Sequence, residues 1–190
     1  VIEDFNLVIT DESGVNVLEY NPLKDSESKE LPSAATAALL PADVETVEQL
    51  FLTGQHLEQY RHATYHPMPY YLEGIKREPS DIRCNNAIGL WKLKKGLFEE
   101  SIPYFNTAIA TMTGKNPNPY NCEAYFNLGV AYLHMDQADK AYDAFFKSTW
   151  DKSFQDAAYF YIAQIDFKRK HYSLCLEHID WSLDRNAKNG

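Results

Sequence analysis

The chain has 190 residues, of which 45% are hydrophobic, and this is enough for one or two domains with a sizeable core. No apolar run approaches the ~18 residues of a membrane-spanning helix, so a membrane protein is not expected. The formal net charge of -9 belongs to residues 1–50, which hold 11 acidic and two basic side chains; the rest is neutral without a basic stripe, which argues against nucleic-acid binding.

The cysteines and the first residue bear on compartment and processing. Cys84, Cys122 and Cys175 are odd in number, far apart and without C-x-x-C spacing, so neither a disulfide framework nor a zinc site is expected. We interpret them as small packing residues and expect a reducing, cytoplasmic location and no metal or cofactor. Because residue 1 is Val, the native start is expected to be missing, through removal of a signal peptide or because the chain belongs to a longer one.

The first 20 residues have the period of β-strands. Apolar and polar side chains alternate from Phe5 to Thr10 and again from Val15 to Tyr20, and the turn between them ends in Gly14. This pattern predicts a β-hairpin within residues 1–20. Since two strands alone are not stable in water, we expect the hairpin to be the tail of an upstream β-domain; the alternative is that it docks on the helices that follow.

Residues 21–43 are acidic and interrupted by prolines, which predicts an extended linker. From residue 44 to 190 the apolar period is helical, which predicts one helical domain. Asp43 or Thr46 is expected to cap its first helix, and a short second helix covers about 69–77.

Two copies of one pattern, offset by forty positions, organise the helical domain. The first copy reads Asn85, Ile88, Gly89, Ser101, Phe105, Ala108. The second copy reads Tyr125, Leu128, Gly129, Ala141, Phe145, Ser148. Weaker copies precede and follow, which gives units near 48–81, 82–115, 122–155 and 156–189, with an insertion at 116–121. In the first unit, counted from Glu48, the glycine is displaced to Gly54.

These units resemble tetratricopeptide repeats (TPR), whose helix–turn–helix units recur every 34 residues. The resemblance implies an all-α fold: a right-handed TPR superhelix, or α-solenoid, of about four repeats, with the β-hairpin as a short N-terminal remnant. The first helix of each repeat would line a concave face. The glycines at positions 89 and 129 would let the two helices of a repeat approach closely.

A narrower resemblance concerns residues 56–64, 82–87 and 116–120, which look like the TPR region of large bacterial proteins. In those proteins a β-sandwich similar to galactose-mutarotase-like and other carbohydrate-active folds precedes the repeats. The resemblance implies that residues 1–20 end such a β-part and that the whole protein is linked to carbohydrates. No catalytic residue of that family maps into this chain, so we do not expect an enzyme.

The concave positions of the first helices are the second, fifth, ninth and twelfth of each repeat. In the first repeat they include Leu52, His56 and Gln59. With the neighbouring insertion, the residues expected to bind a partner are His56, Arg83, Asn86, Leu90, Tyr120, Glu123, Phe126, Val130, Phe160 and Gln164. This groove, apolar with scattered polar groups, suits an amphipathic helix or an extended peptide, unless a neighbouring helix of the same long chain fills it.

TPR domains that grip a C-terminal carboxylate share a Lys/Asn/Arg clamp on these positions. Here only Arg83 and Asn86 fit that clamp, while Glu123 and Phe126 stand where clamp residues are needed. A chaperone-adaptor role is therefore not favoured.

A second candidate site is the run from His56 to His66, in which Glu58, His62 and His66 follow at helical spacing. A metal site is disfavoured because Pro67 ends the helix and no further ligand is placed by spacing. We interpret this run as a polar helix end, or as a surface that docks on the upstream β-domain.

Two functional hypotheses remain. The first is a protein–protein interaction scaffold that binds a peptide or partner domain on the concave face. The alternative is an accessory or oligomerisation domain of a larger bacterial carbohydrate-active protein, mutarotase- or glycosidase-like. Both are compatible with contacts to the upstream β-domain or to a second copy of the chain.

Overall fold

The structure, a computed structural model, describes residues 6–20, 36–61 and 63–186. The chain divides into two compact units, Val1–Ala37 and Ala38–Gly190, and each is described by itself. Most of the expected linker, the first five residues of the expected hairpin segment, and His62 lie outside the described residues.

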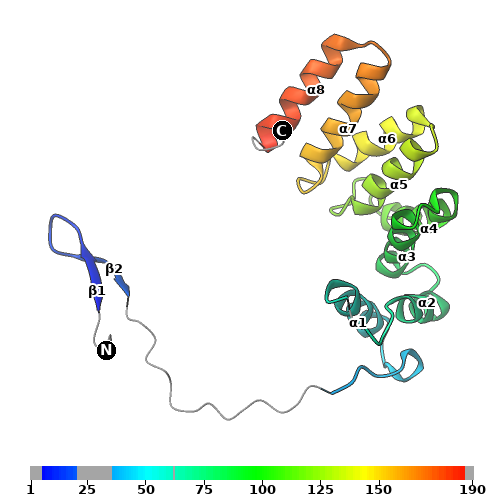
Figure 1. Cartoon of the computed structure of the whole chain (residues 1–190), viewed down its shortest axis with the longest axis horizontal. Helices are drawn as coiled ribbons and strands as arrows, with labels where there is room; N and C mark the ends of the chain where they lie inside the picture. Colours follow the sequence, from blue (N-terminus) through cyan, green and yellow to red (C-terminus); the bar gives the residue numbers. More distant parts are fainter. Residues whose placement is uncertain (1–5, 21–35, 62, 187–190) are drawn as a thin grey trace. The chain divides into compact units, whose positions relative to one another are not determined.

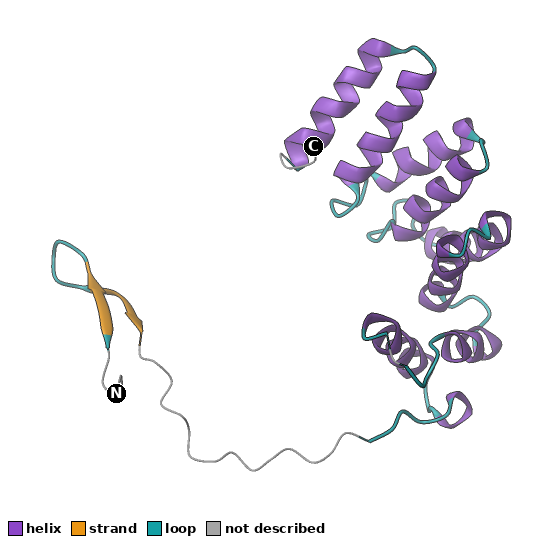
Figure 2. Cartoon of the chain, in the orientation of Figure 1, coloured by secondary structure: helices purple, strands orange, loops and turns teal. Residues whose placement is uncertain are grey.

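The N-terminal unit contains the expected hairpin. Strands β1 (Leu7–Thr10) and β2 (Asn16–Tyr20) pair antiparallel (Figure 2). Asp11 begins the turn, where its carboxylate accepts hydrogen bonds from the backbone N–H groups of Ser13 and Val15, each at 2.9 Å. Gly14 takes a φ of +83°, which side chains with a Cβ rarely adopt.

One face of the hairpin is apolar and exposed. The register pairs Leu7 with Tyr20 and Ile9 with Leu18, so these four side chains lie on the same face. All four are exposed, with between 42% and 56% of their surface accessible. The pairing of the strands is therefore confirmed, and their assignment to a larger β-domain stays a prediction.

The C-terminal unit consists of helices that pack in consecutive pairs (Figure 1). A short 3-10 helix, η1 (Pro41–Asp43), precedes the first pair. The pairs are α1 (Val47–Gln59) with α2 (Met68–Arg77), α3 (Ile82–Lys94) with α4 (Phe98–Thr113), α5 (Glu123–His134) with α6 (Ala138–Ser148), and α7 (Gln155–Lys168) with α8 (Tyr172–Arg185). Each pair also contacts the next, as the repeat pattern predicts.

Side chains named in the sequence fix where two of these helices begin. Thr46, rather than Asp43, caps α1: its hydroxyl accepts from the N–H of Gln49 at 3.1 Å. Asp81 caps α3 by accepting from the N–H of Cys84 at 2.7 Å. The buried amide of Asn85 donates to the carbonyls of Pro79 (2.9 Å) and Asp81 (2.8 Å), which ties the turn between α2 and α3 to the helix start.

A glycine of the first helix faces a ring of the second helix in three of the four repeats. A Cβ at Gly89 would lie 2.6 Å from the ring of Phe105, and one at Gly129 would lie 2.7 Å from the ring of Phe145. Both rings are fully buried, so neither has room to move. These contacts set the distance between the paired helices.

The first repeat makes the same contact, which corrects its register. A Cβ at Gly54 would lie 2.5 Å from the ring of Tyr71. Since α1 begins at Val47, Gly54 is the eighth residue of its repeat, as Gly89 is of a repeat that begins at Ile82. The glycine is therefore not displaced, and the starting point near Glu48 lay one residue too late.

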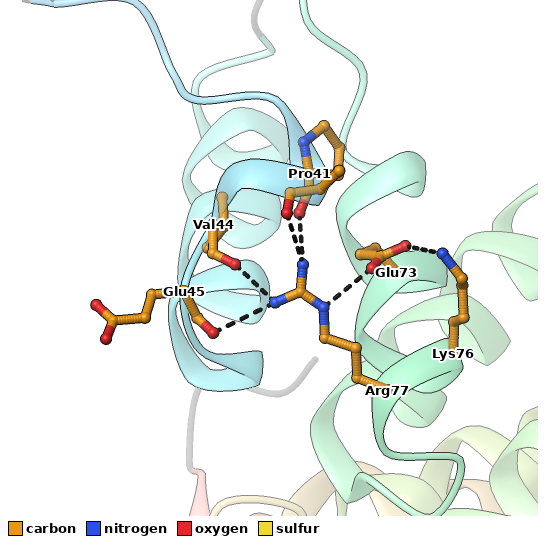
Figure 3. A network of polar contacts seen from close by, with 7 residues as sticks. Pro41, Val44, Glu45, Glu73, Lys76 and Arg77 are labelled. Atoms are coloured by element: carbon orange, nitrogen blue, oxygen red, sulfur yellow. Dashed lines mark hydrogen bonds and ion pairs between the residues drawn. The ribbon is translucent and has the colours of Figure 1, made fainter.

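Arg77 fastens η1 to the first repeat (Figure 3). Its Nη1 donates to the carbonyl of Val44 at 2.6 Å, and its Nη2 donates to the carbonyls of Pro41 and Ala42, both at 3.1 Å. Its Nε donates to Glu73 at 2.9 Å, and this holds the guanidinium in plane with its acceptors. One side chain thus satisfies the carbonyls of a whole turn of backbone.

We expect Gly129→Ala to lower the free energy of unfolding by about 1–2 kcal/mol, because overpacking against a buried ring outweighs the better helix propensity of Ala. Urea unfolding followed by circular dichroism measures this. Gly114→Ala is the matched control, since a Cβ there meets only ordinary contacts of 3.5 Å. A Gly129→Ala protein as stable as that control would contradict the role given to the glycine–ring contact.

We expect Arg77→Met to cost about 1–2 kcal/mol, a modest amount because the guanidinium is partly exposed and water can replace it. Arg77→Lys is expected to rescue little, because one ammonium does not span the carbonyls of Pro41, Ala42, Val44 and Glu45, all of which accept from the guanidinium. Lys76→Met removes the same charge beside the same Glu73 and should change stability little. The rate of hydrogen exchange over residues 41–46 should rise in Arg77→Met but not in Lys76→Met. Equal protection in these two variants would contradict the role given to Arg77.

Candidate functional site

The largest concentration of expected binding residues lies in a pocket between α1, α3 and α5. The pocket has a volume of about 680 Å³. Three consecutive repeats contribute its walls, with Phe51 and Gln55 on α1, Leu90 on α3, and Glu123 on α5. Apolar and polar walls therefore meet around one cavity, which we call the α1–α3–α5 pocket.

The two cations at this pocket are engaged by carboxylates of α1. Arg83 pairs with Glu48 at 3.1 Å and lies over the ring of Phe51, 5.1 Å from its centre. Lys94, which does not line the cavity itself, pairs with the lining residue Glu58 at 2.8 Å. These ion pairs join α1 to α3, and neither cation forms an ion pair with an acid on α5.

Glu123 is the acid left without such a partner. It is the first residue of α5, and within the described part of the chain no cation lies in ion-pair contact with its carboxylate. Burial raises the pKa of Glu123 above its usual range, and the side chains of Asn86 and Asn127 and the charge of Lys94 offset this only in part. The pocket therefore contains a carboxylate whose charged form is incompletely compensated.

Tyr120 projects from the insertion at the rim of the pocket. Its side chain is 99% exposed, although the residues around it are anchored: Pro119 is buried, and the backbone N–H of Cys122 donates to Asp151 at 3.1 Å. Lys147 reaches across from α6 to Asn118 at 3.1 Å. An aromatic ring held out by a fastened loop is well placed to contact a ligand.

The ten residues expected to bind a partner fall into separate places. Five of them line the α1–α3–α5 pocket: Arg83, Asn86, Leu90, Tyr120 and Glu123. Two others, Phe160 and Gln164, line a different cavity of about 260 Å³ formed by α7 and α8.

The remaining three lie outside the cavities described here. Phe126 sits among rings, 5.2 Å from that of Phe154 and 5.6 Å from that of Phe145, and Val130 packs against the same core. Both therefore pack α5 against α6 and α7. His56 is exposed on α1 and contacts the ring of Tyr60 at 4.5 Å.

Sequence reasoning missed three residues of α1 that line the pocket, namely Phe51, Gln55 and Glu58. It selected Leu52, His56 and Gln59 instead, each one position further along, because it started the first repeat at Glu48. The contact between Gly54 and Tyr71 fixes the earlier start, and the selected positions then coincide with the pocket. The position of Gly54, one residue before the place expected for a repeat that starts at Glu48, was the sequence signal that the repeat starts at Val47.

The structure also bears on the metal and catalytic alternatives. Among the described residues, no group of three or more His, Cys, Asp or Glu side chains is placed to hold a metal ion. Asp166 and His178 form a buried pair that joins α7 to α8, in which Nδ1 of His178 lies 2.8 Å from the Asp166 carboxylate. The rings of Tyr142, Tyr159 and Trp181 lie around the imidazole.

Within the described part of the chain, no helix has the length and hydrophobicity required to cross a bilayer.

We expect Glu123→Gln to make stability less dependent on pH. A carboxyl whose folded pKa is raised contributes stability that is fully present below its unfolded pKa, near 4.5, and that is lost as the pH rises through the higher folded value. The free energy of unfolding of the variant, measured with urea, should therefore rise relative to that of the wild type between pH 4 and pH 7. Glu177→Gln, an exposed acid of α8, is the control; if both variants track the wild type alike, Glu123 is not destabilised by burial.

Comparison with known proteins supports the fold. No family model matches the chain. Among solved structures, a crystal structure of MamA is 20% identical with a TM-score of 0.64, covering 78% of this chain and 83% of that one. A MamA chain designated 41-end, from Desulfovibrio magneticus RS-1, is 17% identical with a TM-score of 0.59, and the match covers 76% of this chain and 78% of that one.

These similarities bear on the fold alone. They support a TPR-type helical repeat and give no support to the expected upstream β-sandwich or to a link with carbohydrates. The chain is thus a TPR-like helical repeat with a separate N-terminal β-hairpin.

Proposed function

We propose that the helical unit is a protein-interaction module that binds an extended peptide segment of a partner in the α1–α3–α5 pocket. The observation that carries the proposal is the convergence of three consecutive repeats on one cavity of about 680 Å³. Four of the five expected residues that meet there are on α3 and α5, and the fifth is Tyr120 at the rim.

The chemistry of the walls suits a peptide. Phe51 and Leu90 offer apolar surface for side chains, while the amides of Gln55 and Asn121 are suited to hydrogen-bonding a peptide backbone. The walls are held by interactions within the unit, including the ion pair of Lys94 with Glu58. A preformed site of this kind loses little conformational entropy when a segment binds.

The hairpin and the compartment enter as lesser proposals. We keep residues 1–20 as an edge of a β-domain, because the exposed face of Leu7, Ile9, Leu18 and Tyr20 needs a covering layer for stability. The three cysteines are unpaired and buried, which fits a reducing compartment such as the cytoplasm.

The proposed function is tested by selecting random 12-residue peptides, displayed on phage, against the full chain. Selected peptides should bind with micromolar affinity by fluorescence anisotropy. Gln55→Trp, which fills the pocket with a bulky ring, should weaken binding at least tenfold, and Tyr120→Ala should weaken it several-fold. Gln49→Trp places the same ring on an exposed position of the same helix and should have no effect.

The proposal fails if the selected peptides bind Gln55→Trp as tightly as the wild type. It also fails if peptide binding shifts the amide resonances of other helices while those of α1, α3 and α5 stay unchanged. Circular dichroism of each variant confirms that the fold is intact.

A further inference from the structure

We infer that the segment bound in the α1–α3–α5 pocket carries a basic side chain, arginine or lysine, that pairs with Glu123. The inference rests on the proposed function and specifies its ligand. It is carried by the distribution of charge around the pocket and by the position of Glu123 in its wall.

The charges of the pocket walls leave one acid uncompensated. Four charged residues line the cavity: Glu58, Asp81, Arg83 and Glu123. Glu58 has Lys94 as its partner, and Arg83 pairs with Glu48 outside the cavity. Asp81 serves as the cap of α3, which leaves Glu123 to meet an incoming cation.

Partial burial of Glu123 increases the effect that a nearby cation would have on its carboxylate. The Glu123 side chain lies beside Asn86 of α3 and Asn127 of α5, and these two amides hydrogen-bond to each other at 3.2 Å. Asparagine amides carry no charge, so they solvate the carboxylate without neutralising it. A ligand cation would restore the compensation that burial removes, and a partly buried charge pair is stronger than one in water.

The surroundings favour a basic peptide over a small cation. Tyr120 at the rim and Phe51 in the wall both present aromatic surface at the cavity. The aliphatic stem of a lysine or arginine packs on such surface while its head reaches a carboxylate. The apolar wall formed by Ala87 and Leu90 would take the residue next to the basic one.

The same charges disfavour acidic ligands. A peptide that presents a carboxylate would meet Glu123 directly, while Arg83 would have to leave Glu48 and the ring of Phe51 to compensate. The acidic N-terminal segment of this chain, where residues 1–50 carry the whole net charge of -9, is a poor occupant for the same reason. The occupant that fits these charges is therefore a basic segment of a partner protein.

The experiment compares the peptides selected by three forms of the full chain. Peptides selected by the wild type should be enriched in arginine or lysine at one position. Glu123→Lys should select aspartate or glutamate there instead. Glu177→Lys changes the net charge equally on an exposed position of α8 and should select the same peptides as the wild type.

A matched pair of synthetic peptides refines the comparison. The wild-type chain should bind the best selected arginine peptide about tenfold more tightly than its citrulline analogue, which keeps the shape and loses the charge. Glu123→Gln should bind the two peptides equally.

The outcomes separate the inference from the function on which it rests. Pocket-binding peptides without basic enrichment, or equal affinity for arginine and citrulline in the wild type, would overturn the basic ligand and leave a peptide-binding pocket standing. Selected peptides that bind outside the pocket would overturn both.

Discussion

The contact between a glycine and a ring, found in three of the four helix pairs, is the constraint on which the helical unit depends. Gly54 faces Tyr71, Gly89 faces Phe105 and Gly129 faces Phe145, and in each case the closest distance leaves no room for a Cβ. The glycine allows close approach, and the buried ring fills the space that the approach creates. In the last repeat the equivalent position on α7 is the buried Ala163 instead of glycine.

Because this contact fixes how the two helices of a repeat meet, it also fixes which residues of the first helix remain available. The second, fifth and ninth positions of α3, which are Arg83, Asn86 and Leu90, face the cavity, while Gly89 faces the ring of Phe105 on α4. The fifth, ninth and twelfth positions of the first repeat, Phe51, Gln55 and Glu58, line the same cavity, whereas α5 contributes its second position, Glu123. The pocket is thus a consequence of backbone packing, and its chemistry is decided by the few side chains at those positions.

The sequence predicted the helix pairs well because the repeat imposes spacing rather than composition. Positions tied to packing, such as Phe105 and Phe145, were identified correctly, since a buried ring opposite a glycine leaves few alternatives. The position of Phe126 on the concave face was a weaker inference, because spacing alone did not reveal that three neighbouring rings surround it. Nor did spacing show which charges pair across helices: the partners Arg83 and Glu48 are 35 residues apart and become neighbours only when the repeats stack.

That pairing decides the character of the pocket. Had Arg83 and Lys94 faced the cavity unpaired, the walls would have offered two cations suited to an acidic ligand. Instead Glu48 and Glu58 on α1 hold them, and both ion pairs also fasten α1 to α3. The same carboxylates therefore stabilise the stacking of repeats and remove positive charge from the site, which leaves Glu123 dominant in its electrostatics. In α3 the groove positions Arg83, Asn86 and Leu90 differ from the packing position Gly89, so the charges of the groove can change there without altering the contact between the paired helices.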